Sequence, residues 1–555
     1  IAARLLTTNE MAGTTTIEVS HEALMGEWPR LVGWLREGRE DMHIQQVVSQ
    51  DAAGWERRGK PKDRLYRGSQ LREAQHWASR NLVSTHEAQF LQASTTRQTH
   101  VRTLAIALSL LVVLSFGLII QFAGFLFHPT IVTVATGTGP GSLKQVVNNA
   151  ASGSTITFDR SIWGQTIELT DDLTITNKNL KLHGPGAKLL TIHCKGEINV
   201  FANAALDISD LTITGNKANA ESLLYNAGTL TITNSTIADN TIIAQFSYGA
   251  GIYNRGTLTI TNSTISGNAA SGQMGHGGGI YNRSLATITN STITNNTASY
   301  EAGGIYNFTA SKLTITNSTI ASNSAAGSDG DGGGITNAGE LLITSSTISG
   351  NTTTGPESDG GAISNGNTTR VTLINSTISG NRSSLKGGGI SCFGCQMTIL
   401  FSTIYGNQTR GNGGGFSIQD SKDANGKVIQ SQVSLRNSIV VGNAGKIGPD
   451  IAGTLNSDGY NLFQDLSGAI FPLKATDVHR DTNADLKIDV ALHDNGGLTT
   501  PHTLTHALFP GSPAIDAIPL NGCQTRGIST DQRGMRRPDA DLHLCDIGAY
   551  EYTKR

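Results

Sequence analysis

The chain has 555 residues and a formal net charge of −2, from 41 Lys and Arg against 43 Asp and Glu. This balance produces no global positive field, so we expect no nucleic-acid partner. The five cysteines are too few for a disulfide-dense scaffold. The length allows several domains, and the composition changes twice along the chain.

Residues 1–95 are rich in charge and tryptophan, and they predict an α-helical segment. The stretch His21–Leu35, HEALMGEWPRLVGWL, spaces its apolar residues as on one face of a helix. Further helices are expected over about 41–58 and 69–80.

Residues 104–127, LAIALSLLVVLSFGLIIQFAGFLF, contain no Asp, Glu, Lys or Arg. A helix of this length spans roughly 36 Å, which is enough to cross the hydrocarbon core of a membrane; a buried core helix is the alternative. A basic linker at 96–103 precedes the run, and the first Lys or Arg after it is Lys144. The positive-inside bias therefore predicts a single-pass protein of the cell membrane, with a cytoplasmic N-terminus and an extracellular C-terminal part.

Residues 130–445 repeat two phrases. LTITNSTI stands at Leu230–Ile237, Leu258–Ile265 and Leu313–Ile320, and sequences such as GGGIYN lie between the copies. A repeat period of a few tens of residues is typical of solenoids, and apolar residues alternating with Thr indicate strands. We therefore predict a mainly β fold, a right-handed single-stranded parallel β-helix of about a dozen rungs. A β-sandwich is the alternative.

Within each phrase, Leu230, Ile232 and Ile237 are expected to face the core and the intervening Thr residues to face water. The Asn of each phrase, such as Asn234 or Asn262, lies where the alternation breaks, which indicates a bend. Stacked rungs would place these Asn residues in a ladder inside the coil. An inward Asn would not accept a glycan, although Asn-Ser-Thr matches the acceptor pattern.

Both ends of a solenoid need a cover. Residues 141–150 predict a short amphipathic helix that caps the first rung, with Leu143, Val146 and Val147 on one face. The repeat fades after residue 445, so residues 446–555 are expected to cap the other end or to pack along the side.

One polar position recurs once per rung, directly before each glycine-rich corner. It holds, in order, Tyr248, His276, Glu301, Asp331, Asp359, Lys386 and Asn412. Stacked rungs place such residues about 5 Å apart, so we predict a line of side chains, named the corner column here.

The corner column predicts binding of a sugar chain or a cation, and His276, Glu301, Asp331, Asp359 and Lys386 are its catalytic candidates. Two carboxylates one rung apart would suit retaining glycoside cleavage, and two rungs apart the inverting reaction. Neighbouring acids are expected to raise one another's pKa. A solvated corner that accepts any polar residue is the alternative.

A weaker candidate is a calcium loop with oxygen ligands at Asp481, Asn483, Asp485 and Asp489. Leu486 stands where such a loop needs glycine, so a calcium site is not firmly predicted here. We expect no other cofactor.

Four of the cysteines are candidates for disulfide bonds. Cys392 and Cys395 predict a local disulfide or two free thiols rather than a zinc site. Cys523 and Cys545 flank the terminal motif, and a disulfide between them is expected outside the cell.

Two resemblances follow from particular motifs. VSHEALMGEWPRLVGWL at Val19–Leu35 and LYRGSQLREAQHW at Leu65–Trp77 resemble the segment after the nucleotide-binding core of bacterial novel-type signal-transduction ATPases with numerous domains, the STAND NTPases. That resemblance implies a nucleotide-binding core, encoded upstream or supplied in trans. The chain contains no G-x-x-x-x-G-K-[ST] motif, so ATPase activity is not expected of it.

The second resemblance covers residues 130–555. GPGSLKQVV at Gly139–Val147, the repeats, SPAIDA at Ser512–Ala517 and CDIGAYEY at Cys545–Tyr552 resemble the choice-of-anchor Q proteins. These are surface β-helices of the pectate-lyase-like superfamily, and the resemblance implies no particular enzymatic activity. The apolar run 104–127 would take the place of their anchor.

Together these features predict a membrane-anchored surface β-helix that binds polysaccharide or mediates adhesion, with a cytoplasmic remnant of a signalling ATPase. A polysaccharide lyase or glycoside hydrolase is the first alternative, although no clear motif of either is present. A transmembrane sensor coupled to a STAND NTPase core is the second.

Overall fold

A computed structural model describes residues 6–11, 14–19, 29–127, 130–217, 221–328, 330–538 and 543–553. The chain divides into two compact units, Ile1–Phe127 and His128–Arg555. The predicted helix over 21–35 lies partly outside the described residues, which begin again at Pro29.

The first unit contains a small helical core. Helices α2 (Pro29–Arg57), α3 (Gly68–Ala78) and α4 (Thr85–Phe127) pack through buried aromatic residues. The rings of Trp55 and Phe90 lie 5.4 Å apart, edge to face. The unit also has an antiparallel hairpin that the helical prediction does not include, β1 (Leu6–Met11) with β2 (Thr14–Val19). Its second strand, TTTIEV, is rich in the β-branched residues that favour strands.

Helix α4 is continuous, so residues 96–103, the expected basic linker, are themselves helical. The helix is long and apolar enough to cross a membrane, with a mean hydropathy of 1.4 in its most apolar window within Thr85–Ser115. Leu104, Leu108 and Leu111 are each about 60% or more exposed. By length and composition, the described part of this helix is therefore a candidate membrane span.

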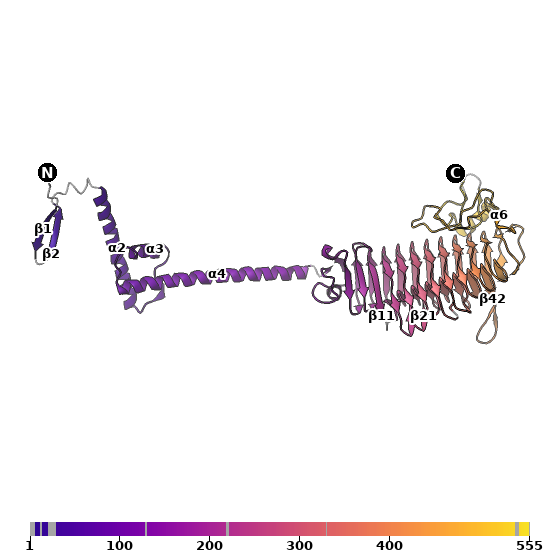
Figure 1. Ribbon diagram of the computed structural model, residues 1–555, viewed down its shortest axis with the longest axis horizontal. Helices are drawn as coiled ribbons and strands as arrows, with labels where there is room; N and C mark the ends of the chain where they lie inside the picture. Colours follow the sequence, from indigo (N-terminus) through magenta and orange to yellow (C-terminus); the bar gives the residue numbers. More distant parts are fainter. Residues whose placement is uncertain are drawn as a thin grey trace. The chain divides into compact units, whose positions relative to one another are not determined.

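The second unit is a right-handed parallel β-helix, as predicted (Figure 1). One 13-stranded sheet runs from β3 (Ile131–Val132) to β48 (Asn456–Ser457), and a 12-stranded sheet from β6 (Leu173–Ile175) to β50 (Ala469–Ile470). A third series of short strands, such as β14 (Thr236–Ala238) and β19 (Thr264–Ser266), closes each turn. The rungs continue to β51 (Val478–His479), beyond the predicted boundary at residue 445.

The register explains why the repeats are needed. Strands β13 (Thr229–Thr233) and β18 (Thr257–Thr261) pair so that Leu230 lies beside Leu258 and Ile232 beside Ile260. Leu230, Ile232 and Ile237 are fully buried, as predicted. Each rung therefore covers the apolar face of the next one.

The predicted Asn ladder forms, since Asn262 Nδ2 donates to Asn234 Oδ1 at 3.3 Å, but the expectation that it lies inside the coil is wrong. Asn234 and Asn262 have φ values of 49° and 50° and lie exposed at the bend. A left-handed backbone turns the side chain out of the coil, and Asn tolerates that conformation.

Buried ladders use other Asn residues of each rung. In one of them, Asn268 Nδ2 donates to Asn296 Oδ1 at 2.8 Å, and Asn296 Nδ2 donates to Asn323 Oδ1 at 2.9 Å. In another, Asn226 Nδ2 donates to Asn254 Oδ1 at 2.7 Å.

The two ends are covered differently. Helix α5 (Leu143–Asn149) lies at the first rung with Leu143, Val146 and Val147 buried, as predicted for the cap. The C-terminal segment packs along the side of the β-helix rather than over its end. Thr347 Oγ1 donates to Leu504 O at 2.7 Å, and Ala549 N donates to Thr403 Oγ1 at 3.0 Å.

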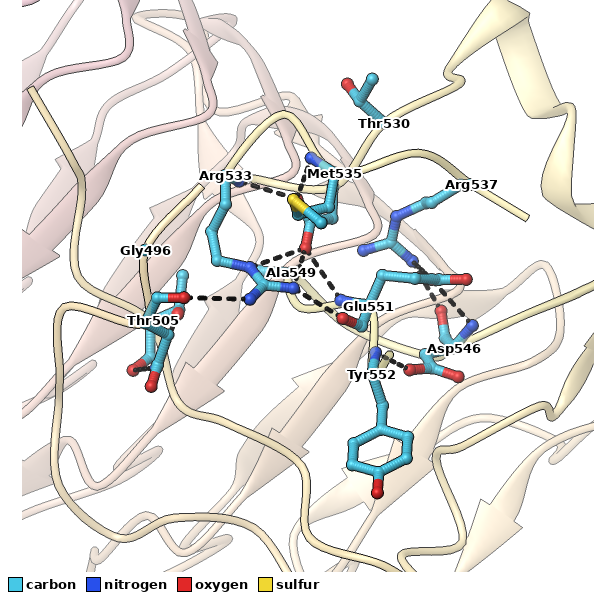
Figure 2. Close-up of polar contacts among 12 residues, drawn as sticks. Gly496, Thr505, Thr530, Arg533, Met535, Arg537, Asp546, Ala549, Glu551 and Tyr552 are labelled. Carbon is cyan, nitrogen blue, oxygen red and sulfur yellow. Dashed lines mark hydrogen bonds and ion pairs between the residues drawn. The ribbon is translucent and has the colours of Figure 1, made fainter. Parts of the chain in front are cut away.

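Buried charged residues fasten this segment (Figure 2). Arg533 Nη2 lies 2.7 Å from Asp531 Oδ2, and Arg537 Nη1 lies 3.1 Å from Glu551 Oε2. The Arg537 guanidinium also stacks 4.7 Å from the ring centre of Phe401, which belongs to the β-helix. The terminal motif is therefore a structural clamp, because its ionic groups are turned toward one another and away from solvent.

Candidate functional site

The structure brings the corner column together in one line. Tyr248, in β16 (Phe246–Tyr248), pairs with His276, in β21 (Met274–His276). Isolated parallel bridges then join His276 to Glu301, Asp359 to Lys386 and Lys386 to Asn412. Asp331 fills the remaining place, because Asp359 N donates to Asp331 Oδ1 at 2.8 Å.

Glycine follows most members of the column because the chain turns there with a left-handed backbone. Gly360, directly after Asp359, has a φ of 64°. A Cβ at Gly360 would lie 2.5 Å from Ile363 O, which real Cβ atoms do not approach. The glycine-rich corner thus fixes where the preceding side chain leaves the coil.

A row of aromatic rings lies beside the first part of the column. The sequence predictions did not nominate these residues, although the Tyr of each GIYN phrase was a visible signal. One Tyr lies at the same register in each of four consecutive strands: β12 (Leu224–Asn226), β17 (Ile252–Asn254), β22 (Ile280–Asn282) and β26 (Ile305–Asn307). In this order they are Tyr225, Tyr253, Tyr281 and Tyr306. Their ring centres are 5.5, 5.4 and 4.9 Å apart along the row, which we name the aromatic row.

The aromatic row and the corner column touch. The Tyr248 ring lies 5.0 Å from the Tyr281 ring, and the His276 ring lies 5.2 Å from the Tyr306 ring. Tyr300 adds a further ring 5.1 Å from His276. Aromatic rings therefore adjoin imidazole and carboxylate groups over several consecutive rungs, and Tyr253 and Tyr281 are themselves only 4% and 5% exposed.

The aromatic row ends beside the two aspartates, Asp331 and Asp359. The residues in register after Tyr306 are Thr336 and Ser364, so small hydroxyl side chains replace the rings. Ser364 Oγ donates to Asp331 Oδ2 at 3.3 Å. The aspartates thus stand next to small polar residues at the point where the rings end.

Burial controls the ionisation of the two aspartates. It raises the pKa of Asp331 to about 7, and repulsion from Asp359 and Glu301 is a smaller contribution in the same direction. It raises the pKa of Asp359 to about 6, against the opposing effect of Lys386. Mutual repulsion was the expected cause, whereas loss of hydration is the larger one.

The neighbours of the aspartates carry both signs of charge. His276 Nδ1 lies 3.2 Å from Glu301 Oε2, and Lys386 Nζ donates to Gln419 Oε1 at 3.1 Å. Burial also raises the pKa of the Tyr281 and Tyr306 phenols, so both are neutral hydrogen-bond donors at physiological pH. The site therefore offers a carboxyl group, Asp331, that titrates near neutrality between the Glu301 and Asp359 side chains, with Lys386 one rung beyond.

The other predicted site residues lie elsewhere. Asp485 belongs to the short helix α6 (Asn483–Leu486), where Thr482 Oγ1 donates to Asp485 Oδ2 at 2.6 Å. Asp481 lies 3.7 Å from His479, and Asp489 lies 3.5 Å from His493. Within the described residues, no three His, Cys, Asp or Glu side chains converge as metal ligands would.

The cysteines form two disulfides, Cys392–Cys395 and Cys523–Cys545. The second one joins β53 (Leu544–Cys545) to the segment that packs on the β-helix. Cys194 has a free thiol and is buried in the core.

Comparison with known proteins gives two family matches. Residues 1–63 match the family described as Novel STAND NTPase 1, and residues 276–461 match the family described as Right handed beta helix region. The comparison with curated proteins gives no match.

Two solved structures are similar to part of the chain. The A-module of the mannuronan C-5 epimerase AlgE4 from Azotobacter vinelandii is 13% identical, with a TM-score of 0.35; the match covers 68% of this chain and 97% of that one. ORF18 of Geobacillus virus E2 is 14% identical, with a TM-score of 0.22 and a coverage of 63% of each chain.

Proposed function

We propose that the β-helix binds an elongated polysaccharide along the face formed by the corner column and the aromatic row. The observation that carries this proposal is the contact between the two lines, made by Tyr248 with Tyr281 and by His276 with Tyr306. A sugar ring presents C–H groups and hydroxyl groups together, and it needs apolar faces beside polar ones. A line of such pairs that repeats once per rung fits a ligand that also repeats along its length.

We also propose that helix α4 anchors the protein in the cell membrane, with the N-terminal unit cytoplasmic and the β-helix outside. Its apolar run and the basic residues before it support this placement. The disulfides are consistent with an oxidising exterior. The resemblance of the terminal motif to choice-of-anchor Q proteins supports a surface role such as adhesion.

Binding is tested with the full-length protein in detergent, first on a glycan array and then by calorimetry with the glycans that bind. Lys386→Gln and Glu301→Gln are expected to weaken binding by about tenfold, because each removes a charged partner for sugar hydroxyls. Lys312→Gln is the matched control, since Lys312 is a lysine of the same β-helix that pairs with Glu340 away from the column. Equal affinity of all three variants and the wild type would refute the proposed face.

A second candidate function, acid–base cleavage of the bound polysaccharide, is favoured by Asp331 and Asp359. They lie one rung apart, and their raised pKa values allow one to be protonated while the other is ionised near neutral pH. Release of reducing ends, abolished in Asp331→Asn and Asp359→Asn, would establish cleavage. Binding without release of reducing ends would refute cleavage and support binding as the only function of this face.

A further inference from the structure

A cavity in the N-terminal unit has no part in the proposed polysaccharide site. It has a volume of about 720 Å³ and lies between the end of α2, the turn around the 3₁₀ helix η1 (Lys62–Arg64) and the first half of α4. That volume is in the range of ligand pockets in proteins. Its lining runs along α4 from Gln89 to Leu104, where the apolar run begins.

The lining carries positive charge and no acid among the described residues. Lys60, Lys62, Arg97 and His100 line the cavity, and Asp and Glu are absent from that lining. Lys60 is already engaged, since its Nζ donates to Gln89 Oε1 at 3.2 Å and lies 3.7 Å from Glu56 Oε1, which is outside the lining. Lys62 and Arg97 carry the remaining positive charge of the lining. The electrostatic preference of the cavity is therefore for an anion.

Two buried donors in the lining have no hydrogen-bond partner within the described part of the chain. These are the indole Nε1 of Trp55, a residue only 6% exposed, and Nη1 of Arg97. An unpaired buried donor costs stability unless something binds it. Both donors are of kinds that bind phosphate oxygens, and the guanidinium does so with a geometry that matches the group.

The other end of the same lining is apolar. Val101 and Leu104 line the cavity and are 60% and 62% exposed. Arg97 and Leu104 are seven residues apart on one helix, or roughly 10 Å along its axis. A ligand that fills the cavity therefore meets positive charge at one end and apolar surface at the other.

We propose that this cavity binds the headgroup of an anionic phospholipid at the membrane surface. The phosphate contacts Arg97, Lys62 and the Trp55 indole, and the acyl chains follow Val101 and Leu104 onto the apolar part of α4. A zwitterionic lipid fits less well, because its headgroup cation would meet only positive side chains. The inference rests on the proposed membrane insertion of α4 and is independent of polysaccharide binding.

The test uses the full-length protein in detergent and native mass spectrometry, with phosphatidylglycerol and phosphatidylcholine of the same acyl chains as probes. The wild type is expected to retain one phosphatidylglycerol with at least tenfold preference over phosphatidylcholine. Arg97→Gln and Lys62→Gln are each expected to reduce that retention by about tenfold. Arg102→Gln is the matched control, because Arg102 is a nearby arginine of α4 that does not line the cavity.

Equal loss in Arg97→Gln and Arg102→Gln would overturn the proposal in favour of general attraction to a basic helix. Full retention in Arg97→Gln would also overturn it. Competition by inorganic phosphate at the same concentration as the lipid would show a site for free phosphate and overturn the lipid assignment. Trp55→Phe, which keeps the ring and removes the N–H, is expected to weaken retention several-fold while circular dichroism stays unchanged.

Membrane insertion is checked separately by extraction of cell membranes with alkaline carbonate. Release of the protein would overturn the membrane placement, and the lipid ligand with it. A protein that stays in the membrane but does not distinguish the two lipids would overturn the cavity assignment alone.

Discussion

Replacement of Asp331 by Asn is expected to stabilise the protein at high pH and to leave it unchanged at low pH. The Asp331 carboxyl is buried in the corner column and accepts hydrogen bonds from Asp359 N and Ser364 Oγ. The Asn side chain has the same shape and keeps one acceptor oxygen, so the column retains its hydrogen bond from Asp359. The substitution removes only the cost of holding a charge in this place.

The size of the expected gain in stability follows from the pKa of Asp331, which burial raises from 3.8 to about 7. The folded protein therefore keeps a proton that the unfolded chain releases between about pH 4 and pH 7, so stability falls as pH rises through this window. Each pKa unit corresponds to about 1.4 kcal/mol, which sets an upper limit of about 4 kcal/mol above pH 7. We expect Asp331→Asn to increase the free energy of unfolding by roughly 2–4 kcal/mol at pH 8 and by nearly nothing at pH 4.

Guanidinium titrations of the full-length protein at pH 4, 6 and 8, followed by far-UV circular dichroism, measure the difference. Glu340→Gln is the control, because the Glu340 side chain is 51% exposed on another face and should change stability by less than about 0.5 kcal/mol. A lower stability of Asp331→Asn at pH 8 would refute the reasoning, and so would a gain of equal size at pH 4. Either result would mean that burial does not destabilise the ionised Asp331 carboxylate in the folded protein.

Three further predictions concern stability. Asn296→Ala removes a member of the internal amide ladder and is expected to cost about 2–4 kcal/mol in chemical unfolding, because buried partners on both neighbouring rungs lose a hydrogen bond. Arg537→Met leaves Glu551 buried without its cation, so we expect a loss of about 3–5 kcal/mol, detected as faster limited proteolysis of the C-terminal segment; cleavage at the wild-type rate would argue against the clamp. Cys523→Ser opens the loop that Cys523 closes with Cys545 and is expected to cost about 3 kcal/mol, measured as a lower thermal midpoint than that of the wild type under non-reducing conditions.

The β-helix and the corner column were predictable because a solenoid is built from local repeats. Residues at the same phase of successive repeats come to lie side by side, whatever the rest of the chain does. The alternation around Leu230 therefore identified the buried side chains, and the position before each glycine corner identified the line from Tyr248 to Asn412.

The helical part was less predictable at its boundaries. Residues 96–103 contain charged and polar residues and were assigned to a linker, but they continue α4 into the apolar run. Charged residues are compatible with an exposed helix, so composition alone does not mark where such a helix begins.

The sequence by itself determined the solenoid, its phase, the apolar helix and the order of groups in the corner column. Only the tertiary structure decided which Asn faces inward, because that depends on the sign of φ at the bend, as at Asn234. It also decided that the aromatic row meets the column, since His276 and Tyr306 come from different rungs. The docking of the C-terminal segment and the raised pKa of Asp331 depend likewise on contacts between distant parts of the chain, which no local pattern encodes.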